Sequence, residues 1–160
     1  ESFAQYRKTG GRVAVFSIPE EVVNAAIAHA LPMIASDGLL QNGKGHPRAA
    51  GTYARILGRY VREAKILSLM DALRKMTIMP AQRLERRVPM MKNKGRIRLG
   101  ADADLTIFDA ERIIDNATFE EPGKYSEGIK YVLVNGVLVV ENGQLRNEVW
   151  PGRAVRAPMQ

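Results

Sequence analysis

Cysteine is absent from the 160-residue sequence, and histidine occurs twice, as His29 and His46. Without cysteine, the chain has no disulfide, no thiolate nucleophile and no sulfur ligand for a metal. A catalytic zinc usually takes about three protein ligands, and the two histidines form no HxH, HxxxH or HExxH pair. We therefore expect that this chain by itself binds no metal.

Long apolar runs and aromatic side chains are also scarce. No stretch approaches the ~20 apolar residues that a membrane-spanning helix needs, so no membrane partner is expected. Lys and Arg outnumber Asp and Glu by 24 to 17, and basic residues crowd residues 83–98. That segment has no aromatic residue on which bases would stack, which favours a solvated or interface-facing basic surface over nucleic-acid binding.

The length and the apolar content set the size of the fold. Hydrophobic residues make up 46% of the chain, enough to build a core of ordinary size. A complete (β/α)₈ barrel needs about 200 to 250 residues, so any barrel features in this sequence come from part of a barrel.

The first third of the chain has a β-α-β pattern. The apolar, β-branched residues 12–18 predict a buried strand, and Pro19 then begins a predicted helix that extends to residue 31. Residues 32–35 predict a second short strand, parallel to the first. A long Gly-rich loop is expected from there to Gly51.

Helices and then antiparallel strands are predicted over the remainder. Ser68 and Asp71 form a capping box for one helix, and Asn135-Gly136 marks a tight hairpin. Pro80 is expected to interrupt the helical region before a short further turn. The predicted helices cover residues 52–65, 68–77 and 81–84, and the predicted strands cover residues 104–108, 129–134 and 137–140, with a polar excursion at 115–125.

Asp37 is the first candidate for chemistry. It directly follows the predicted strand 32–35 and precedes the loop that carries His46 and Arg48. In parallel α/β folds, sites form at the carboxyl ends of the strands. The alternative is that Ser36-Asp37-Gly38 is only turn chemistry, and the sequence pattern leaves both interpretations open.

Several motifs together resemble the C-terminal third of the N-acyl-D-amino-acid deacylases, or D-aminoacylases, a branch of the metal-dependent amidohydrolase superfamily. The similarity extends over nearly the whole chain. The KGRIRLGADADL segment and the VNG hairpin are typical of the superfamily, whereas GHPR and ATFEEP favour the deacylase branch. The matching motifs are ASDG (35–38), GHPR (45–48), LSLMDALRKMTIMPAQRL (67–84), KGRIRLGADADLTIFD (94–109), IIDNATFEEPGKYSEGIKYVLVNGVLVVENGQ (113–144) and PGR (151–153).

The resemblance implies an α/β plus β fold: the C-terminal fragment of a TIM-type barrel, with its last βαβ piece and following helices, joined to strands of a small β-sandwich. Residues 1–88 would end the hydrolase barrel, and residues 89–160 would form the C-terminal part of the sandwich. The metal-binding histidines of the family lie earlier in the parent chain, so zinc or another divalent metal is expected in the full-length parent. The fragment alone is expected to be inactive.

The resemblance also assigns roles to three residues. Asp37 matches the aspartate after the eighth barrel strand, which acts as general acid and base on the water that the metal activates, and is a possible metal ligand. Arg48 matches a residue that binds the substrate carboxylate, which suits a planar guanidinium. The alternative for Arg48, a surface arginine that holds the Gly-rich loop in place, also stays open. His46 is expected to shape the loop or contact the substrate. His29 is assigned to the helix surface or to packing, and Ser36 to hydrogen bonding.

The expected activity is hydrolysis of the amide bond of N-acyl-D-amino acids by a bacterial cytoplasmic enzyme. Expected partners are the small-molecule substrate, the remaining N-terminal part of the parent and further copies of the enzyme. Two alternatives stay open: a cyclic-amide hydrolase of the hydantoinase or dihydroorotase type, and a non-catalytic assembly domain.

Overall fold

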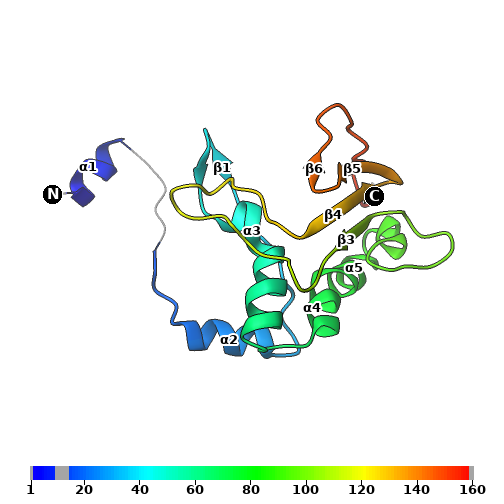
Figure 1. The fold of residues 1–160 in the computed structure, drawn as a ribbon, viewed down its shortest axis with the longest axis horizontal. Helices are drawn as coiled ribbons and strands as arrows, with labels where there is room; N and C mark the ends of the chain where they lie inside the picture. Colours follow the sequence, from blue (N-terminus) through cyan, green and yellow to red (C-terminus); the bar gives the residue numbers. More distant parts are fainter. Residues whose placement is uncertain (1, 10–14, 159–160) are drawn as a thin grey trace.

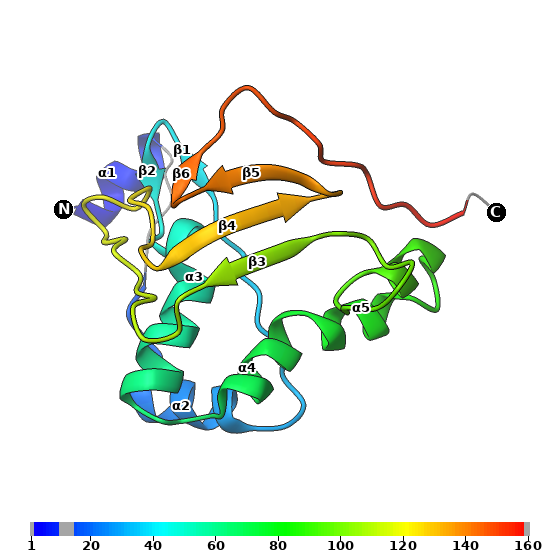
Figure 2. The ribbon, with the colours of Figure 1, turned by 45° about the vertical axis from the view of Figure 1, so that its right-hand side comes forward.

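The computed structural model describes residues 2–9 and 15–158. A group of helices lies on one side and an antiparallel sheet on the other, as Figures 1 and 2 show. The helices, in chain order, are α1 (Ser2–Thr9), α2 (Glu20–Ala28), α3 (Arg48–Arg55), the π-helical η1 (Ile56–Glu63), α4 (Leu69–Met76), α5 (Ile78–Leu84) and the 3₁₀ segment η2 (Pro89–Asn93).

The described residues form two sheets, and both are antiparallel. The larger has the order β3-β4-β5-β6, and the smaller is a hairpin of two two-residue strands that precedes α3 in the chain. Among the described residues, the strands form no closed barrel, and no helix is long and apolar enough to cross a membrane. The strands are β1 (Leu40–Gln41), β2 (Lys44–Gly45), β3 (Leu105–Phe108), β4 (Ile129–Val134), β5 (Val137–Glu141) and β6 (Gln144–Leu145).

The predicted helix after Pro19 is confirmed as α2, but the two strands beside it are wrong where the structure describes them. Residues 12–14 lie outside the described residues, and residues 15–18 are irregular, with Phe16 82% exposed. Residues 32–35 are not in a strand either, although the Ile34 N–H donates to the Lys75 carbonyl at 3.2 Å. A strand needs a neighbouring strand for its ladder, and no described segment pairs with either stretch.

The predicted capping box is confirmed at α4. Ser68 Oγ accepts the backbone N–H of Asp71 at 3.1 Å, which satisfies one donor of the first helical turn. The predicted interruption at Pro80 is wrong, because the helices separate at Thr77, where φ is −128° and ψ −80°. Pro80 instead occupies the first turn of α5, where a missing N–H leaves no helical hydrogen bond unmade.

The hairpin predicted at Asn135-Gly136 is confirmed. Both residues have positive φ, 47° and 79°, and connect β4 to β5. The predicted strand 104–108 is also confirmed as β3, and Asp104 Oδ1 accepts the Asn135 N–H at 2.7 Å. The Asp104 side chain, directly before β3, therefore binds the turn that connects β4 to β5.

The predicted long loop contains more structure than expected. Asn42 and Gly43 have φ values of 52° and 72° and close the β1–β2 hairpin. The helix that follows begins at Arg48 rather than at residue 52, and it continues through η1 to Glu63. This earlier start places Arg48 in the first helical turn.

The core lies between α2, α3, η1 and α4. The segment after β3 also enters it through Ile113, which is buried among the helices. Phe108 and Ile129 extend the apolar contact to the sheet. The buried members of this core are Ile27, Ala54, Ile56, Leu57, Tyr60, Ala72 and Ile113.

Hydrogen bonds from two arginines hold the 109–117 segment on α3 and η1. Arg55 Nε donates to Asp115 Oδ2 at 2.8 Å, and the Asp115 side chain is 5% exposed. Arg62 Nη1 donates to the Ile113 carbonyl at 2.6 Å. Gly51 makes the approach possible, because a Cβ at that position would lie 1.8 Å from Asp115 Oδ1.

Replacing Gly51 with alanine is expected to destabilise the fold by about 1–3 kcal/mol, because the added methyl group must displace the buried Asp115 carboxylate. Chemical denaturation of Gly51→Ala and of the unsubstituted chain measures the difference in the free energy of unfolding. Gly152→Ala is the matched control, because a Cβ at Gly152 meets no atom within 4 Å. Equal stability of the two variants would contradict the close contact.

Candidate functional site

Asp37 and Arg48 form the centre of the candidate site. Arg48 Nη2 lies 3.0 Å from Asp37 Oδ2, and Arg48 Nε donates to the Asp37 carbonyl at 2.9 Å. One guanidinium therefore fixes both the side chain and the main chain of Asp37. The carboxylate is nevertheless 90% exposed, so it remains open to a further partner.

The local backbone explains how these two residues meet. Asp37 has φ of 43°, in the left-handed region that Asp tolerates better than most residues. The next residue, Gly38, passes directly over the start of α3, where a Cβ would lie 2.2 Å from the Ala49 Cα. A side chain at Gly38 would therefore push the Asp37 segment away from Arg48.

His46 lies next to this pair. Its Nδ1 accepts the backbone N–H of Arg48 at 3.1 Å, which satisfies one of the free donors at the start of α3. Burial lowers the pKa of His46, and the positive charges of Arg48 and Arg55 lower it further. The neutral ring that accepts through Nδ1 carries its proton on Nε2.

Phe119 is a member of this region that the sequence analysis missed. Its ring lies edge-on to His46, with 5.0 Å between the ring centroids. The residue is far from His46 in the sequence, within the predicted polar excursion 115–125, and no local spacing connects the two. The ATFEEP motif was the available signal, because it marked this segment as part of the resemblance.

The other two sequence candidates, His29 and Ser36, make no contact that assigns them to this site. His29 ends α2, where its Nδ1 accepts the Leu31 N–H at 3.3 Å. Ser36 is partly buried beside Asp37. Asp37, His46 and Arg48 thus lie together as a cluster, and their chemical roles stay predictions.

A metal centre needs more ligands than this cluster offers. Within residues 2–9 and 15–158, no three His, Cys, Asp or Glu side chains come together in a way that would hold a metal ion. Asp37 is the one acidic side chain of the cluster, and its exposed carboxylate suits a single oxygen ligand or a proton acceptor. Additional ligands would have to come from outside this chain.

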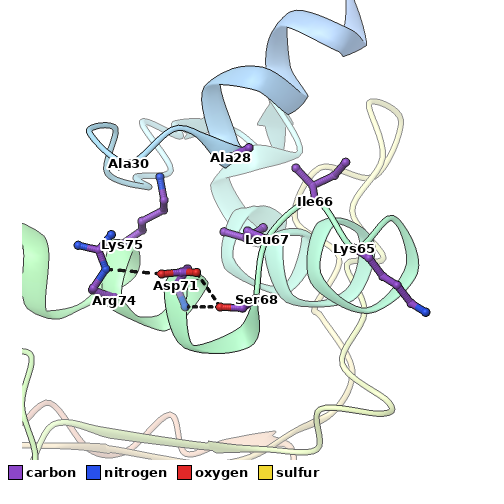
Figure 3. A pocket seen from close by; sticks show the side chains of 9 residues that line it. All are labelled: Ala28, Ala30, Lys65, Ile66, Leu67, Ser68, Asp71, Arg74 and Lys75. Atoms are coloured by element: carbon purple, nitrogen blue, oxygen red, sulfur yellow. Dashed lines mark hydrogen bonds and ion pairs between the residues drawn. The ribbon is translucent and has the colours of Figure 1, made fainter.

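A cavity of about 460 Å³ lies elsewhere, between the end of α2 and the start of α4. Figure 3 shows Asp71, one of its lining residues, joined to Ser68 and Arg74. Lys75, which is buried, donates to the carbonyls of His29 and Pro32, and burial lowers its pKa. The Lys75 bonds hold α4 against the segment after α2. Lys75 and Asp71 therefore stabilise the fold at this cavity, and we assign them no catalytic role.

Comparison with known proteins gives one family and a consistent set of relatives. Residues 16–140 match the amidohydrolase family. The chain is 41% identical over 141 residues to an N-acyl-D-glutamate deacylase of Alcaligenes xylosoxydans xylosoxydans, covering 88% of this chain and 28% of that protein. It is 38% identical over 124 residues to a D-aminoacylase from the same source, covering 78% of this chain and 25% of the enzyme.

Solved structures agree with these sequence matches. A D-aminoacylase crystal structure superposes with a TM-score of 0.76 at 35% identity, over 83% of this chain and 27% of that one. A second structure is an N-acyl-D-glutamate deacylase from Bordetella bronchiseptica, complexed with zinc and a phosphonate mimic of the tetrahedral intermediate. It superposes with a TM-score of 0.79 at 38% identity, over 89% of this chain and 28% of that one. The chain therefore spans about a quarter of the length of these relatives.

The lowered pKa of His46 predicts a pH-dependent loss of stability. The unfolded chain binds a proton near the ordinary histidine pKa of ~6.5, whereas the folded chain binds it at lower pH. The folded state should therefore lose stability as the pH falls below about 6.5 and through the lower folded-state pKa. As the pH is lowered from 7 into the acid range, the melting temperature of His46→Gln should therefore fall less than that of the unsubstituted chain.

His29→Gln is the control, because it leaves the contacts of His46 in place. An equal fall in melting temperature for the unsubstituted chain and for His46→Gln over this pH range would show that His46 does not contribute to the pH dependence of stability.

Proposed function

The chain belongs to the amidohydrolase family, and from that premise we propose that it is the C-terminal part of a metal-dependent enzyme that hydrolyses N-acyl-D-amino acids. The observation that carries the proposal is the contact between Asp37 and Arg48. In this pair a carboxylate, which can accept a proton, lies next to a guanidinium, which can bind a carboxylate, and an N-acyl amino acid presents an amide and a carboxylate close together. The named relatives are deacylases of such compounds.

The architecture that we propose for the complete enzyme is a TIM-type barrel joined to a small β-sandwich, with residues 1–88 ending the barrel and residues 89–160 contributing to the sandwich. Exposed apolar side chains before and after α2 support this proposal. Phe16, Ile18 and Leu31 are all largely exposed, as expected for segments that pair with further strands. Residues 32–35 would then be the strand that Asp37 follows.

A divalent metal, with zinc the first candidate, would be bound mainly by residues outside this chain. The N-acyl-D-glutamate deacylase structure contains zinc, and D-aminoacylase is described with a binuclear metal centre. When bound, such a metal lowers the pKa of water and so supplies a nucleophile near neutral pH. We propose that Asp37 is the residue of this chain that lies beside the metal.

Asp37 performs the proton transfer in this proposal. Its carboxylate accepts a proton from the attacking water and passes it to the nitrogen of the leaving amine. The positive backbone φ and the bond from Arg48 Nε to the Asp37 carbonyl fix the residue in the orientation from which it acts. The exposed carboxylate is accessible to a substrate from outside.

Arg48 binds the free carboxylate of the substrate. A guanidinium has five N–H donors, and the bonds to Asp37 use Nε and one donor of Nη2. The remaining donors are available for a second carboxylate, and the planar group allows a bidentate contact. Arg48 would thus align the substrate with Asp37 through a shared guanidinium.

The two alternatives have less support. The matched relatives are deacylases of linear N-acyl-D-amino acids, which does not favour a cyclic-amide hydrolase. The Asp37–Arg48 pair does not favour a purely structural domain. Self-association, assembly with the rest of the parent and a bacterial cytoplasmic location stay predictions.

In the complete enzyme, Asp37→Asn should reduce kcat by about 10²- to 10⁴-fold, because asparagine keeps the shape of the side chain but cannot accept the proton. KM should change little, and a melting curve checks that the fold is retained. If Asp37 only forms a turn, asparagine serves equally well and kcat stays within a few-fold of the original.

Arg48→Ala should mainly raise KM for substrates with a free carboxylate, because the substrate loses its ionic partner. An uncharged amide analogue of the same substrate is the control: its KM should be nearly unaffected, whereas kcat should fall for both substrates because Asp37 loses the bonds that fix it. An equal rise in KM for both substrates would mean that Arg48 supports the Asp37 backbone without binding the carboxylate.

A further inference from the structure

Three aromatic rings form a row beside the candidate site. Phe16 lies edge-on to Phe119, with 4.9 Å between the centroids and 63° between the planes. Phe119 in turn lies edge-on to His46, at 5.0 Å and 70°. Edge-to-face ring contacts are favourable beyond the apolar area that they bury, so Phe119 contributes to holding the imidazole in place.

The segment that carries Phe119 is fixed by the helix that carries Arg48. Arg55 lies about two turns after Arg48 on α3 and binds the buried Asp115 carboxylate at 2.8 Å. Asp115 Oδ1 also accepts the Ala117 N–H at 2.8 Å, just before Phe119. The same helix therefore fixes Arg48 at its first residue and the Phe119 segment at its last.

The orientation of His46 matters for Arg48. An imidazole on its own rotates broadly about its last side-chain torsion, and rotation would break the bond from the Arg48 N–H to Nδ1. That bond satisfies a donor at the start of α3, where the backbone orients the Arg48 side chain. Phe119 packs against the imidazole in this T-shaped contact and so restricts the rotation.

We propose that Phe119 is a positioning residue for carboxylate binding, acting through His46 on Arg48. The inference rests on the proposed function of Arg48. It assigns a role in the site to residue 119, which lies in the segment between β3 and β4.

The kinetic test uses the complete enzyme with Phe119→Leu, which keeps an apolar side chain but removes the ring. KM for an N-acyl-D-amino acid should rise about threefold to tenfold, with kcat and the KM for its uncharged amide analogue nearly unchanged. Phe119→Tyr keeps the ring and should restore KM. Tyr125→Leu is the matched control, since Tyr125 is an exposed aromatic residue of the same polar segment.

A double mutant tests whether Phe119 acts through His46. In a His46→Ala background, Phe119→Leu should have no further effect on KM, because the ring it orients is gone. The proposal would be overturned if the effects of the two substitutions on KM were additive, or if Phe119→Leu left KM unchanged. It would also be overturned if KM rose equally for the acid and the amide substrates.

An NMR measurement separates this inference from the proposed function. The 160-residue chain has two histidines, so ¹⁵N-histidine labelling gives few signals. His46 should show the tautomer with the proton on Nε2, and Phe119→Leu should shift the ring nitrogens towards tautomer averaging. Identical nitrogen shifts in both proteins would overturn the positioning role, whereas an enzyme without deacylase activity would refute the proposed function alone.

Discussion

The ion pair between Arg55 and Asp115 joins the helical side of the molecule to the segment that leads into the sheet. The Asp115 carboxylate is almost fully buried, and Gly51 leaves the space that it occupies. A buried carboxylate without its cationic partner is costly, so α3 and this segment keep one relative position. Every contact of the candidate site with the second half of the chain depends on that position, including the contact between Phe119 and His46.

The candidate site itself is assembled at the first turn of α3. Gly38 lets the chain pass close to Ala49, and Arg48 then binds Asp37 through both its carboxylate and its carbonyl. The two charges offset each other in the structure described, and both stay accessible. In the function that we propose, Asp37 would transfer the proton and Arg48 would bind the carboxylate, while the metal ligands would come from elsewhere in the complete enzyme.

Local signals predicted the elements whose stabilising contacts are local. The Ser68 cap and the Asn135-Gly136 turn were identified correctly because each bonds within a few residues. The strands predicted at residues 15–18, the described part of 12–18, and at 32–35 were not, because apolar periodicity shows that a segment is suited to a sheet but not whether a partner strand is present. Phe119 was missed for a similar reason, since its contact with His46 joins distant parts of the chain.

The central claim is that this chain completes a metal-dependent deacylase specific for N-acyl-D-amino acids. The most direct measurement is the rate of hydrolysis by the complete enzyme of an N-acetyl-D-amino acid, its L enantiomer and a cyclic amide. The rates are measured with zinc present and after chelation. If the proposed function is right, the enzyme hydrolyses the D compound in the presence of zinc, and chelation abolishes this activity. The L compound and the cyclic amide are then hydrolysed slowly or not at all. Faster hydrolysis of the cyclic amide, or deacylation that chelation leaves unchanged, would contradict it.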